Sequence, residues 1–375
     1  ELLGVPATGE PCAELWFGAH PSAPALVGAA GEPLDAVIAL DPVSALGSDV
    51  ADRFTGLPFL MKILAAARPL SLQAHPSASQ AATGFDRESA RGVPLDSPER
   101  CFRDRSHKPE VICAIGGFSA LCGFRDPVAS LELLDSLPTP ALDPVRRRLE
   151  SPASDGRAAI LAALRWLLTL PAAEGAELVS ALTDALAHAG GDGSPELNEV
   201  ARLGASFPGD AGVVVALLMN LVELGPGEAL FLGPGTLHAY LRGTGVEVMA
   251  NSDNVVRGGL TSKPVDATTL LEIVDPTPGG PEVLDPEPVG GVARYETPAA
   301  EFVLERVEIA GEWTLAPGPA ILLCTGGAVT VGPHALARGG AVWVRADEPA
   351  ATISGSGTLF RCRTPAREGG RRVGP

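Results

Sequence analysis

The spacing of apolar residues changes twice along this chain of 375 residues. In the first third, short apolar runs such as Leu57–Leu64, Pro69–His75 and Val111–Ile115 lie between glycine and proline residues, which is typical of buried strands. From about residue 128 the apolar residues recur every three or four positions, which predicts helices. The predicted helices are Val128–Leu137, Pro144–Leu149, Arg157–Leu170, Ala173–Ala189, Pro195–Ser206 and Ala211–Leu224.

Strand patterns return after Gly225. The runs Ala229–Leu232, Val246–Met249 and Leu270–Val274 predict strands, and the proline- and glycine-rich stretch 275–291 predicts a long loop. Short strands at regular spacing in the last hundred residues predict a sandwich or jelly roll, with a frayed tail from Pro365. These strands are Phe302–Ile309, Ala320–Cys324, Ala328–Val331, Ala341–Arg345 and Thr358–Arg363.

Composition narrows the functional classes. The formal net charge of −17 argues against a nucleic-acid-binding surface, although a local cationic site for an anionic substrate remains compatible with it. The longest apolar runs fall short of the ~18 residues of a membrane-spanning helix, and Glu1–Glu10 shows no signal-peptide pattern. The six cysteines form no Cys-x-x-Cys pair, so we expect reduced thiols and a cytoplasmic protein.

Two polar segments could carry chemistry. On a strand, Ser71, Gln73 and His75 would point to one face, where they could meet solvent or bind a metal. In the segment His107-Lys108-Pro109-Glu110, Glu110 leads directly into the apolar run that follows. This segment is compatible with a polar turn, or with a carboxylate that points into the mouth of a barrel.

Two further segments lie after the helical region. A strand leads into the turn Gly233-Pro234-Gly235, and His238 follows three residues later. This arrangement resembles the second motif of cupins, in which such a histidine binds a metal inside the barrel. Further on, Glu247 and Met249 share a strand face, and Arg257 and Lys263 could form either a solvated loop or a cationic rim for a phosphate.

Taken together, these segments resemble the type I phosphomannose isomerase family, of the cupin superfamily. The resemblance rests on their order along the chain from Ala13 to about Asp266. The motifs are Ala13–Pro21, Leu57–Leu60, Gln73–Pro76, His107–Glu110, Pro234–Tyr240 and Glu247–Arg257. One departure is that family members normally begin with a strand carrying a Tyr-x-Trp-Gly-Ser-like segment, and Glu1–Gly4 starts just after it.

The resemblance implies a mainly β fold with a helical insertion, that is, cupin or jelly-roll barrels plus an all-helical domain. It implies one Zn²⁺ per chain, held by Gln73, His75, Glu110 and His238. It also implies catalytic Arg257 and Glu247, and a substrate pocket lined by Ser71, Lys108, Tyr240, Asp253 and Lys263. Lys62 receives no role, and we expect its stem to reach solvent from an apolar run.

We divide the chain into residues 1–125 and 225–275, which form the catalytic cupin domain, 126–224, the helical domain, and 276–375, a C-terminal jelly roll. The expected partner is a hexose 6-phosphate, with no nucleic acid and no membrane, and we expect a monomer.

The implied reaction interconverts mannose 6-phosphate and fructose 6-phosphate through an enediolate. With one carboxylate among its ligands, the zinc site keeps net positive charge and can act as a Lewis acid. Arg257 is a poor default base because of its high pKa, whereas Glu247 is an easier base if burial raises its pKa, so the base assignment stays open. The alternatives are a non-catalytic metal-dependent sugar-phosphate-binding cupin and an iron-dependent cupin oxygenase. No glycine-rich phosphate loop supports a nucleotidyltransferase.

Overall fold

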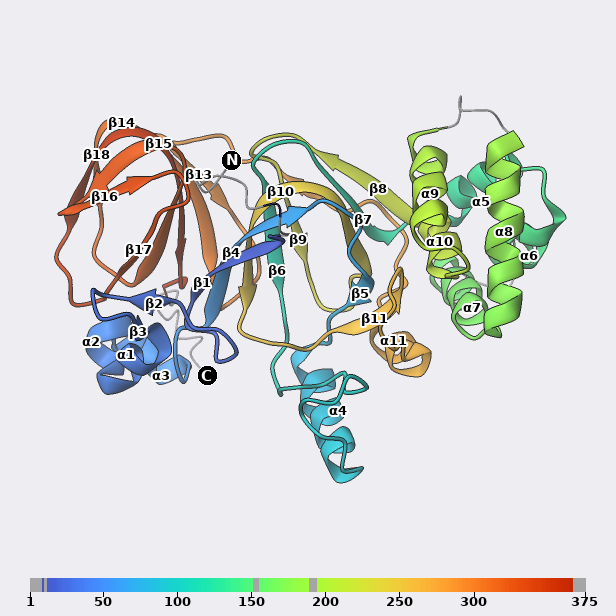
Figure 1. Ribbon diagram of the computed structural model, residues 1–375, viewed down its shortest axis with the longest axis horizontal. Coiled ribbons are helices and arrows are strands. Elements are labelled where there is room, and N and C mark those ends of the chain that lie inside the picture. The colour runs from blue at the N-terminus through green and yellow to red at the C-terminus, as the bar shows by residue number, and fades with distance from the viewer. Residues whose placement is uncertain (1–8, 10–11, 151–154, 189–193, 367–375) are drawn as a thin grey trace, which may run out of the picture.

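The computed structural model describes residues 9, 12–150, 155–188 and 194–366, and it combines helices with two large sheets (Figure 1). Neighbouring strands in both sheets run antiparallel. The mixture of helix and sheet agrees with the prediction of a mainly β chain interrupted by helices. The expected frayed tail from Pro365 and the expected start of the chain fall largely outside the described residues.

The first sheet has ten strands, and β10 (His238–Ala250) lies at its centre. The first half of β10 pairs with β5 and β7, and its second half pairs with β4 and β6, so this one strand connects both halves of a curled sheet. The other strands are β1 (Glu14–Gly18), β4 (Phe59–Ala66), β5 (Leu72–Ala74), β6 (Glu110–Ala114), β7 (Phe118–Phe124), β8 (Met219–Leu224), β9 (Ala229–Leu232), β11 (Val256–Gly259) and β12 (Val283–Leu284).

The change of partners along β10 depends on Gly243. Its φ of 119° lies in a region that side-chain-bearing residues rarely adopt, and a Cβ there would lie 2.6 Å from the carbonyl oxygen of Gly117. A glycine at this position therefore permits β7 to approach closely where the pairing changes.

The second sheet lies beside the first in Figure 1 and is built from the C-terminal residues. Its strands are β13 (Val292–Tyr295), β14 (Val303–Leu315), β15 (Ala320–Val331), β16 (His334–Ala337), β17 (Ala341–Val344) and β18 (Ala351–Arg363). The prediction of separate strands at Ala320–Cys324 and Ala328–Val331 was wrong, because β15 continues through both with an irregularity between Cys324 and Gly326. A third sheet pairs only β2 (Leu26–Val27) with β3 (Glu32–Pro33).

Most predicted helices between residues 127 and 206 are confirmed. Side-chain caps fix where several begin: Asp126, Asp155 and Ser194 each accept a hydrogen bond from a backbone N–H in the first turn. The helices of this region are α5 (Pro127–Asp135), η1 (Pro140–Leu142), α6 (Asp143–Leu149), α7 (Gly156–Leu168), α8 (Ala172–His188), α9 (Pro195–Ser206), α10 (Gly212–Val215) and η2 (Ala216–Leu218).

Two predicted elements between residues 211 and 274 are wrong. The predicted helix Ala211–Leu224 ends at Leu218, and its last six residues form β8, which pairs with β7. The predicted strand Leu270–Val274 is instead helix α11 (Ala267–Ile273), whose first turn is capped by Asp266. Both errors concern short apolar runs, for which periodicity alone does not separate helix from strand.

Four helices in the first 125 residues were not predicted: α1 (Leu34–Leu40), α2 (Pro42–Leu46), α3 (Ser48–Arg53) and α4 (Ala78–Ala90). For α4 a sequence signal was present, since Ser77 and Gln80 form a capping box. No single helix among the described residues is long and apolar enough to cross a membrane, and α7 and α8 pass that test only together, as a pair bent by 112°.

The two large sheets meet through a shared apolar core and through polar contacts. The hydroxyl of Tyr295 donates to the carbonyl oxygen of Gly227 at 2.6 Å. His107, in the loop before β6, forms a 2.8 Å pair with Glu301, which precedes β14. The pKa of His107 is raised by its hydrogen bond to Glu301. Burial opposes ionisation of Glu301, but the same hydrogen bond holds the pKa of Glu301 below its ordinary value.

The His107–Glu301 pair predicts a pH-dependent contribution to stability. The raised pKa of His107 contributes stability that is complete below about pH 6.5 and is lost as pH rises through the raised value. The lowered pKa of Glu301 contributes stability that is lost only in acid. We therefore expect Glu301→Gln to lower the melting temperature most between about pH 5 and 6.5, and much less at pH 9.

The matched control is Glu296→Gln, which removes an exposed carboxylate from the same segment. It should change the melting temperature little at any pH. A Glu301→Gln deficit of the same size at pH 5.5 and pH 9 would show that the pair contributes no titratable stability.

Candidate metal and substrate site

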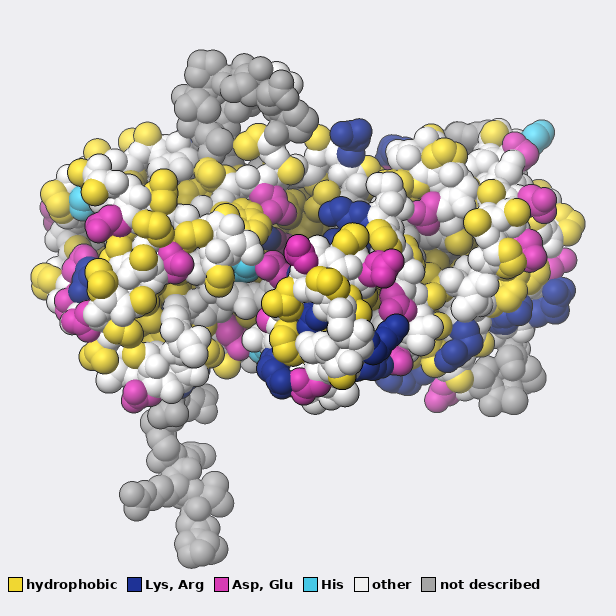
Figure 2. Space-filling model, turned by 60° about the horizontal axis from the view of Figure 1, so that its bottom comes forward, with side chains coloured by type: hydrophobic (Ala, Val, Ile, Leu, Met, Phe, Trp, Pro, Cys, Tyr) yellow, Lys and Arg dark blue, Asp and Glu magenta, His cyan; other side chains and the backbone are white. Residues whose placement is uncertain are grey.

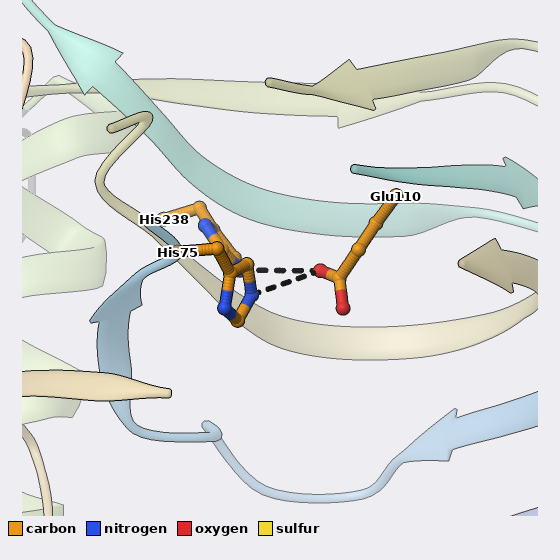
Figure 3. Close-up of side chains that lie close together, drawn as sticks. All are labelled: His75, Glu110 and His238. Carbon is orange, nitrogen blue, oxygen red and sulfur yellow. Dashed lines mark ion pairs between the residues drawn. The ribbon is translucent and has the colours of Figure 1, made fainter. Parts of the chain in front are cut away.

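Three buried side chains from separate segments converge on one carboxylate oxygen (Figure 3). Oε2 of Glu110, at the start of β6, lies 3.2 Å from Nε2 of His75 and 3.6 Å from Nε2 of His238. His75 follows β5 directly, and His238 is the first residue of β10. The side chains of all three are at most 2% exposed. The structure thus brings together residues that the sequence placed in three separate motifs.

The other ring nitrogens set the tautomers of the two histidines. Nδ1 of His75 lies 2.8 Å from the carbonyl oxygen of Asn254, and Nδ1 of His238 lies 2.9 Å from that of Thr236. A carbonyl oxygen only accepts hydrogen bonds, so Nδ1 carries the proton in both rings. Each Nε2 therefore directs a lone pair toward Glu110, which is the arrangement of metal-binding histidines.

The residues present fit a zinc ion. Tetrahedral zinc with bonds of about 2.0–2.1 Å separates neighbouring ligand atoms by roughly 3.3 Å, close to the separations of both Nε2 atoms from Oε2 of Glu110. Nε2 of His75 is moreover buried without a hydrogen-bond partner. Two imidazole lone pairs that face a carboxylate repel it, and a divalent cation would reverse that repulsion.

Gln73 lies on the same face of the sheet as His238. In register, it is opposite both His238 on β10 and Arg257 on β11, and residues opposite one another share a face of the sheet. Its Nε2 is 3.3 Å from Nε2 of His238, and its Oε1 accepts a hydrogen bond from Ser71. Metal binding by Gln73 needs the amide oxygen, so the amide would turn over when it becomes a ligand.

Lys108 gives the cluster its charge balance. Its Nζ lies 2.8 Å from Oε1 of Glu110, and the residue is buried. Burial opposes ionisation of Glu110, but the charge of Lys108 holds the pKa of Glu110 well below its ordinary value. Burial lowers the pKa of His238 to about 4. Near neutral pH the cluster therefore presents an ionised carboxylate and an unprotonated His238, as metal binding requires.

A second buried pair of charged side chains, Lys62 and Glu247, lies on neighbouring strands of the same sheet. In register, Glu247 on β10 is opposite Lys62 on β4, and Oε2 of Glu247 lies 3.2 Å from Nζ of Lys62. The other oxygen, Oε1, accepts a 2.9 Å hydrogen bond from the hydroxyl of Tyr240. Burial raises the pKa of Glu247, and Lys62 only partly opposes this. Burial, and then the charge of Glu247, raise the pKa of Tyr240 well above its ordinary value.

Sequence reasoning missed Lys62. The expectation that its stem reaches solvent was wrong, because the residue is 5% exposed and its ammonium group also lies 5.0 Å from the ring centroid of Trp16. A signal was available, since a lysine inside an otherwise apolar strand needs a buried carboxylate as partner. The side-chain periodicity of two does not identify that partner on another strand.

The remaining predicted site residues, Arg257, Asp253 and Lys263, lie outside the group of His75, Glu110 and His238. Arg257 is half-buried and lines a cavity of about 480 Å³ with Arg100 and Asp266, and burial lowers its pKa. Asp253 contacts His20 and Ser22 rather than the metal-binding group. Lys263 is exposed in the loop after β11. The structure gives neither Asp253 nor Lys263 a contact with Glu110.

Comparison of this sequence with those of known proteins leads to the same family as the motifs do. Residues 4–127 match the family model for the catalytic domain of type I phosphomannose isomerase. Mannose-6-phosphate isomerase of Escherichia coli K12 is 35% identical over 374 residues, covering 96% of this chain and 94% of the relative. The chain belongs to the type I phosphomannose isomerase family. The human mannose-6-phosphate isomerase, at 33% identity over 91% of this chain and 86% of its own length, extends the family across kingdoms.

Solved structures of the family share the fold. A mutant of phosphomannose isomerase from Salmonella typhimurium superposes with a TM-score of 0.91 at 33% identity, covering 97% of this chain and 94% of that chain. A mannose 6-phosphate isomerase bound with zinc and yttrium gives a TM-score of 0.90, also at 33% identity and with the same coverage. The group of His75, Glu110 and His238 is thus able to hold a metal ion in a fold that binds zinc in a relative.

The geometry predicts that zinc binding depends on Glu110. Glu110→Gln removes the only charged ligand and leaves Lys108 buried without its carboxylate. We expect zinc affinity to fall by at least about 100-fold, and the rise in melting temperature on adding zinc to the chelated protein to disappear. Elemental analysis of the dialysed protein and thermal melts measure the two effects.

Glu247→Gln is the matched control, because it alters a buried carboxylate of the neighbouring row without touching the ligands. It should retain about one zinc per chain. Unchanged zinc content in Glu110→Gln would exclude Glu110 as a ligand.

Proposed function

We propose that this chain is a zinc-dependent aldose–ketose isomerase that interconverts mannose 6-phosphate and fructose 6-phosphate. The observation that carries the proposal is the buried convergence of His75, His238 and Glu110 beside the Lys62–Glu247 pair. A metal-binding group and an acid–base pair on neighbouring strands of one sheet supply the two needs of an isomerisation, charge stabilisation and proton transfer.

The reaction moves one hydrogen between C2 and C1 of the sugar. A base removes the proton from C2, an enediolate forms, and the proton is returned at C1. Glu247 suits the task of base because burial raises its pKa toward the working range. Lys62 and Tyr240 each bind one of its oxygens, so the carboxylate is oriented and its charge is offset when it is ionised.

Gln73, His75, Glu110 and His238 are the residues that would hold zinc. Zinc supplies positive charge that polarises the sugar carbonyl and stabilises developing negative charge. Lys108 places a second positive charge beside Glu110, and its ammonium group can donate to a substrate oxygen. Tyr240 and Ser71 add hydroxyl donors on the same side of the sheet.

For the phosphate of the substrate we propose Arg257, with Lys263 and Asp253 at the rim. Arg257 is opposite Gln73 in register, which directs a planar guanidinium group to the face that carries the metal-binding row. Such a group matches phosphate oxygens well. Arg257 also remains a candidate for assisting proton movement, alongside Glu247.

The finer architecture belongs to the same proposal. We propose that the first sheet, from residues 1–125 and 225–275, forms a cupin barrel, that residues 126–224 form a helical domain, and that 276–375 form a jelly roll. The two curled sheets and the grouped helices of Figure 1 support this division. We also propose that the protein is a monomer and that it is cytoplasmic. The six free cysteines support the cytoplasmic location.

A metal-dependent sugar-phosphate binder without turnover is the second candidate. It would keep the metal-binding group, but it has less use for a buried pair such as Lys62–Glu247. Burying two charges is costly unless they serve each other or a substrate. An assay for turnover separates the two candidates directly.

We expect the chelated protein to be inactive in a coupled assay that detects fructose 6-phosphate formed from mannose 6-phosphate. One equivalent of zinc should restore activity, since the metal supplies the charge on which the enediolate depends. Substrate binding without turnover in the zinc-restored protein would favour the non-catalytic binder. Oxygen consumption by the iron-loaded protein, without formation of fructose 6-phosphate by the zinc-loaded protein, would favour the iron-dependent oxygenase.

Arg257→Ala should lower kcat/KM by about 10²–10³-fold and leave zinc content unchanged. The reason is that Arg257 is proposed to bind the phosphate and is not part of the group of His75, Glu110 and His238. Arg257→Lys is the matched control, and we expect only partial recovery, because an ammonium lacks the planar fork. Equal loss of zinc and of turnover in Arg257→Ala would instead indicate a damaged fold.

A further inference from the structure

A cavity of about 550 Å³ lies between the N-terminal helices and the C-terminal sheet, away from the metal-binding group. Its walls are residues 46–50 of α2 and α3, residues 316–319 between β14 and β15, and the end of β18 with the residues that follow it. In Figure 1, α1, α2 and α3 lie against one end of the second sheet. Neither the proposed catalytic residues nor the proposed metal ligands line this cavity.

The walls are held together by hydrogen bonds between distant segments. The backbone N–H groups of Ala346 and Asp347 donate to the carbonyl oxygens of Ala45 and Ser44 at 2.9 and 3.1 Å. The guanidinium group of Arg53, in α3, donates to the carbonyl oxygen of Pro365. The cavity is therefore fixed in shape by both parts of the chain, and its size is that of a small-molecule site.

Two arginines share one carboxylate at the wall of the cavity. Nη1 of Arg361 lies 3.3 Å from Oε2 of Glu305, and Nη2 of Arg363 lies 3.0 Å from Oε1 of the same residue. Asp49, which also lines the cavity, is balanced by Arg53 one turn further along α3. The group thus keeps one net positive charge on a chain of net charge −17. Burial lowers the pKa of Arg361, and Glu305 only partly offsets this.

Two buried donors at the same wall have no partner among the described residues. Nε of Arg361 and Oγ1 of Thr364 make no hydrogen bond to that part of the chain, although these residues are only 9% and 8% exposed. A guanidinium nitrogen only donates, and a hydroxyl can donate. Both residues line the cavity, so an oxyanion bound there would offset the excess charge and bring hydrogen-bond acceptors next to these two side chains.

We propose that this cavity binds a small oxyanion, the phosphate or carboxylate group of a metabolite, through Arg361, Arg363 and Thr364. The bound anion contacts both the N-terminal helices and the C-terminal sheet, and so it joins the two parts of the chain. The site is separate from the pocket proposed for the phosphosugar.

Thermal melts of the zinc-loaded protein test the proposal, with inorganic phosphate and succinate as probes and sodium chloride of equal ionic strength as reference. At roughly ten times the dissociation constant, the better probe should raise the melting temperature by about 2 °C. A larger rise with phosphate identifies a phosphate site, and a larger rise with succinate a carboxylate site. No rise above the chloride reference with either probe overturns the proposal.

Thr364→Val distinguishes this cavity from the catalytic pocket, which also attracts phosphate. The substitution keeps the side-chain shape and removes a hydroxyl that makes no hydrogen bond, so the melting temperature without the anion should stay the same or rise. The anion-dependent rise should fall by at least half. Arg363→Gln should abolish it, and Thr352→Val, at an exposed threonine of the same strand, should leave it intact. An undiminished rise in both Thr364→Val and Arg363→Gln would place the anion elsewhere and overturn the proposal.

Discussion

The organisation of the site depends on keeping one carboxylate ionised inside the protein. Glu110 is 2% exposed, and burial alone would favour its neutral form. Lys108 provides the compensating charge, and the two histidines contribute rings whose Nδ1 protons are committed to backbone carbonyls. These contacts fix an anionic centre with two lone pairs beside it. A divalent cation completes such a centre more favourably than a proton would, because it attracts all three groups at once.

The antiparallel sheet explains how distant motifs reach that centre. Because residues opposite one another on antiparallel strands share a face, β10 aligns His238 with Gln73, and Glu247 with Lys62. The strand carries both rows because its pairing changes near Gly243. The metal-binding row and the acid–base row are thus neighbours through a single strand, and a change in its register would move both.

Much of the site could be predicted from sequence because each motif carries its own local geometry. A glycine-proline-glycine turn sets the position of His238, and a proline separates Lys108 from Glu110. What sequence reasoning missed depends on contacts between strands. Lys62 was expected to reach solvent because its partner Glu247 lies 185 positions further along the chain. The strand predicted at Leu270–Val274 is helical because Asp266 caps it, whereas its apolar run alone fits either structure.

Two of the buried cation–carboxylate groups among the described residues differ in a way that bears on their proposed roles. Lys62 and Glu247 form a pair of balanced charge, with Tyr240 bound to the second carboxylate oxygen. The carboxylate of Glu247 is held in place by these contacts, and Lys62 offsets its charge. Glu247 can therefore lose and regain one proton without leaving an uncompensated charge. Arg361 and Arg363 share Glu305 and keep an excess positive charge that no described neighbour neutralises. Arginine does not give up its proton near neutral pH, so this second group can attract an anion but cannot transfer protons. On the two proposals made above, proton transfer therefore belongs to the first sheet and anion binding to the second.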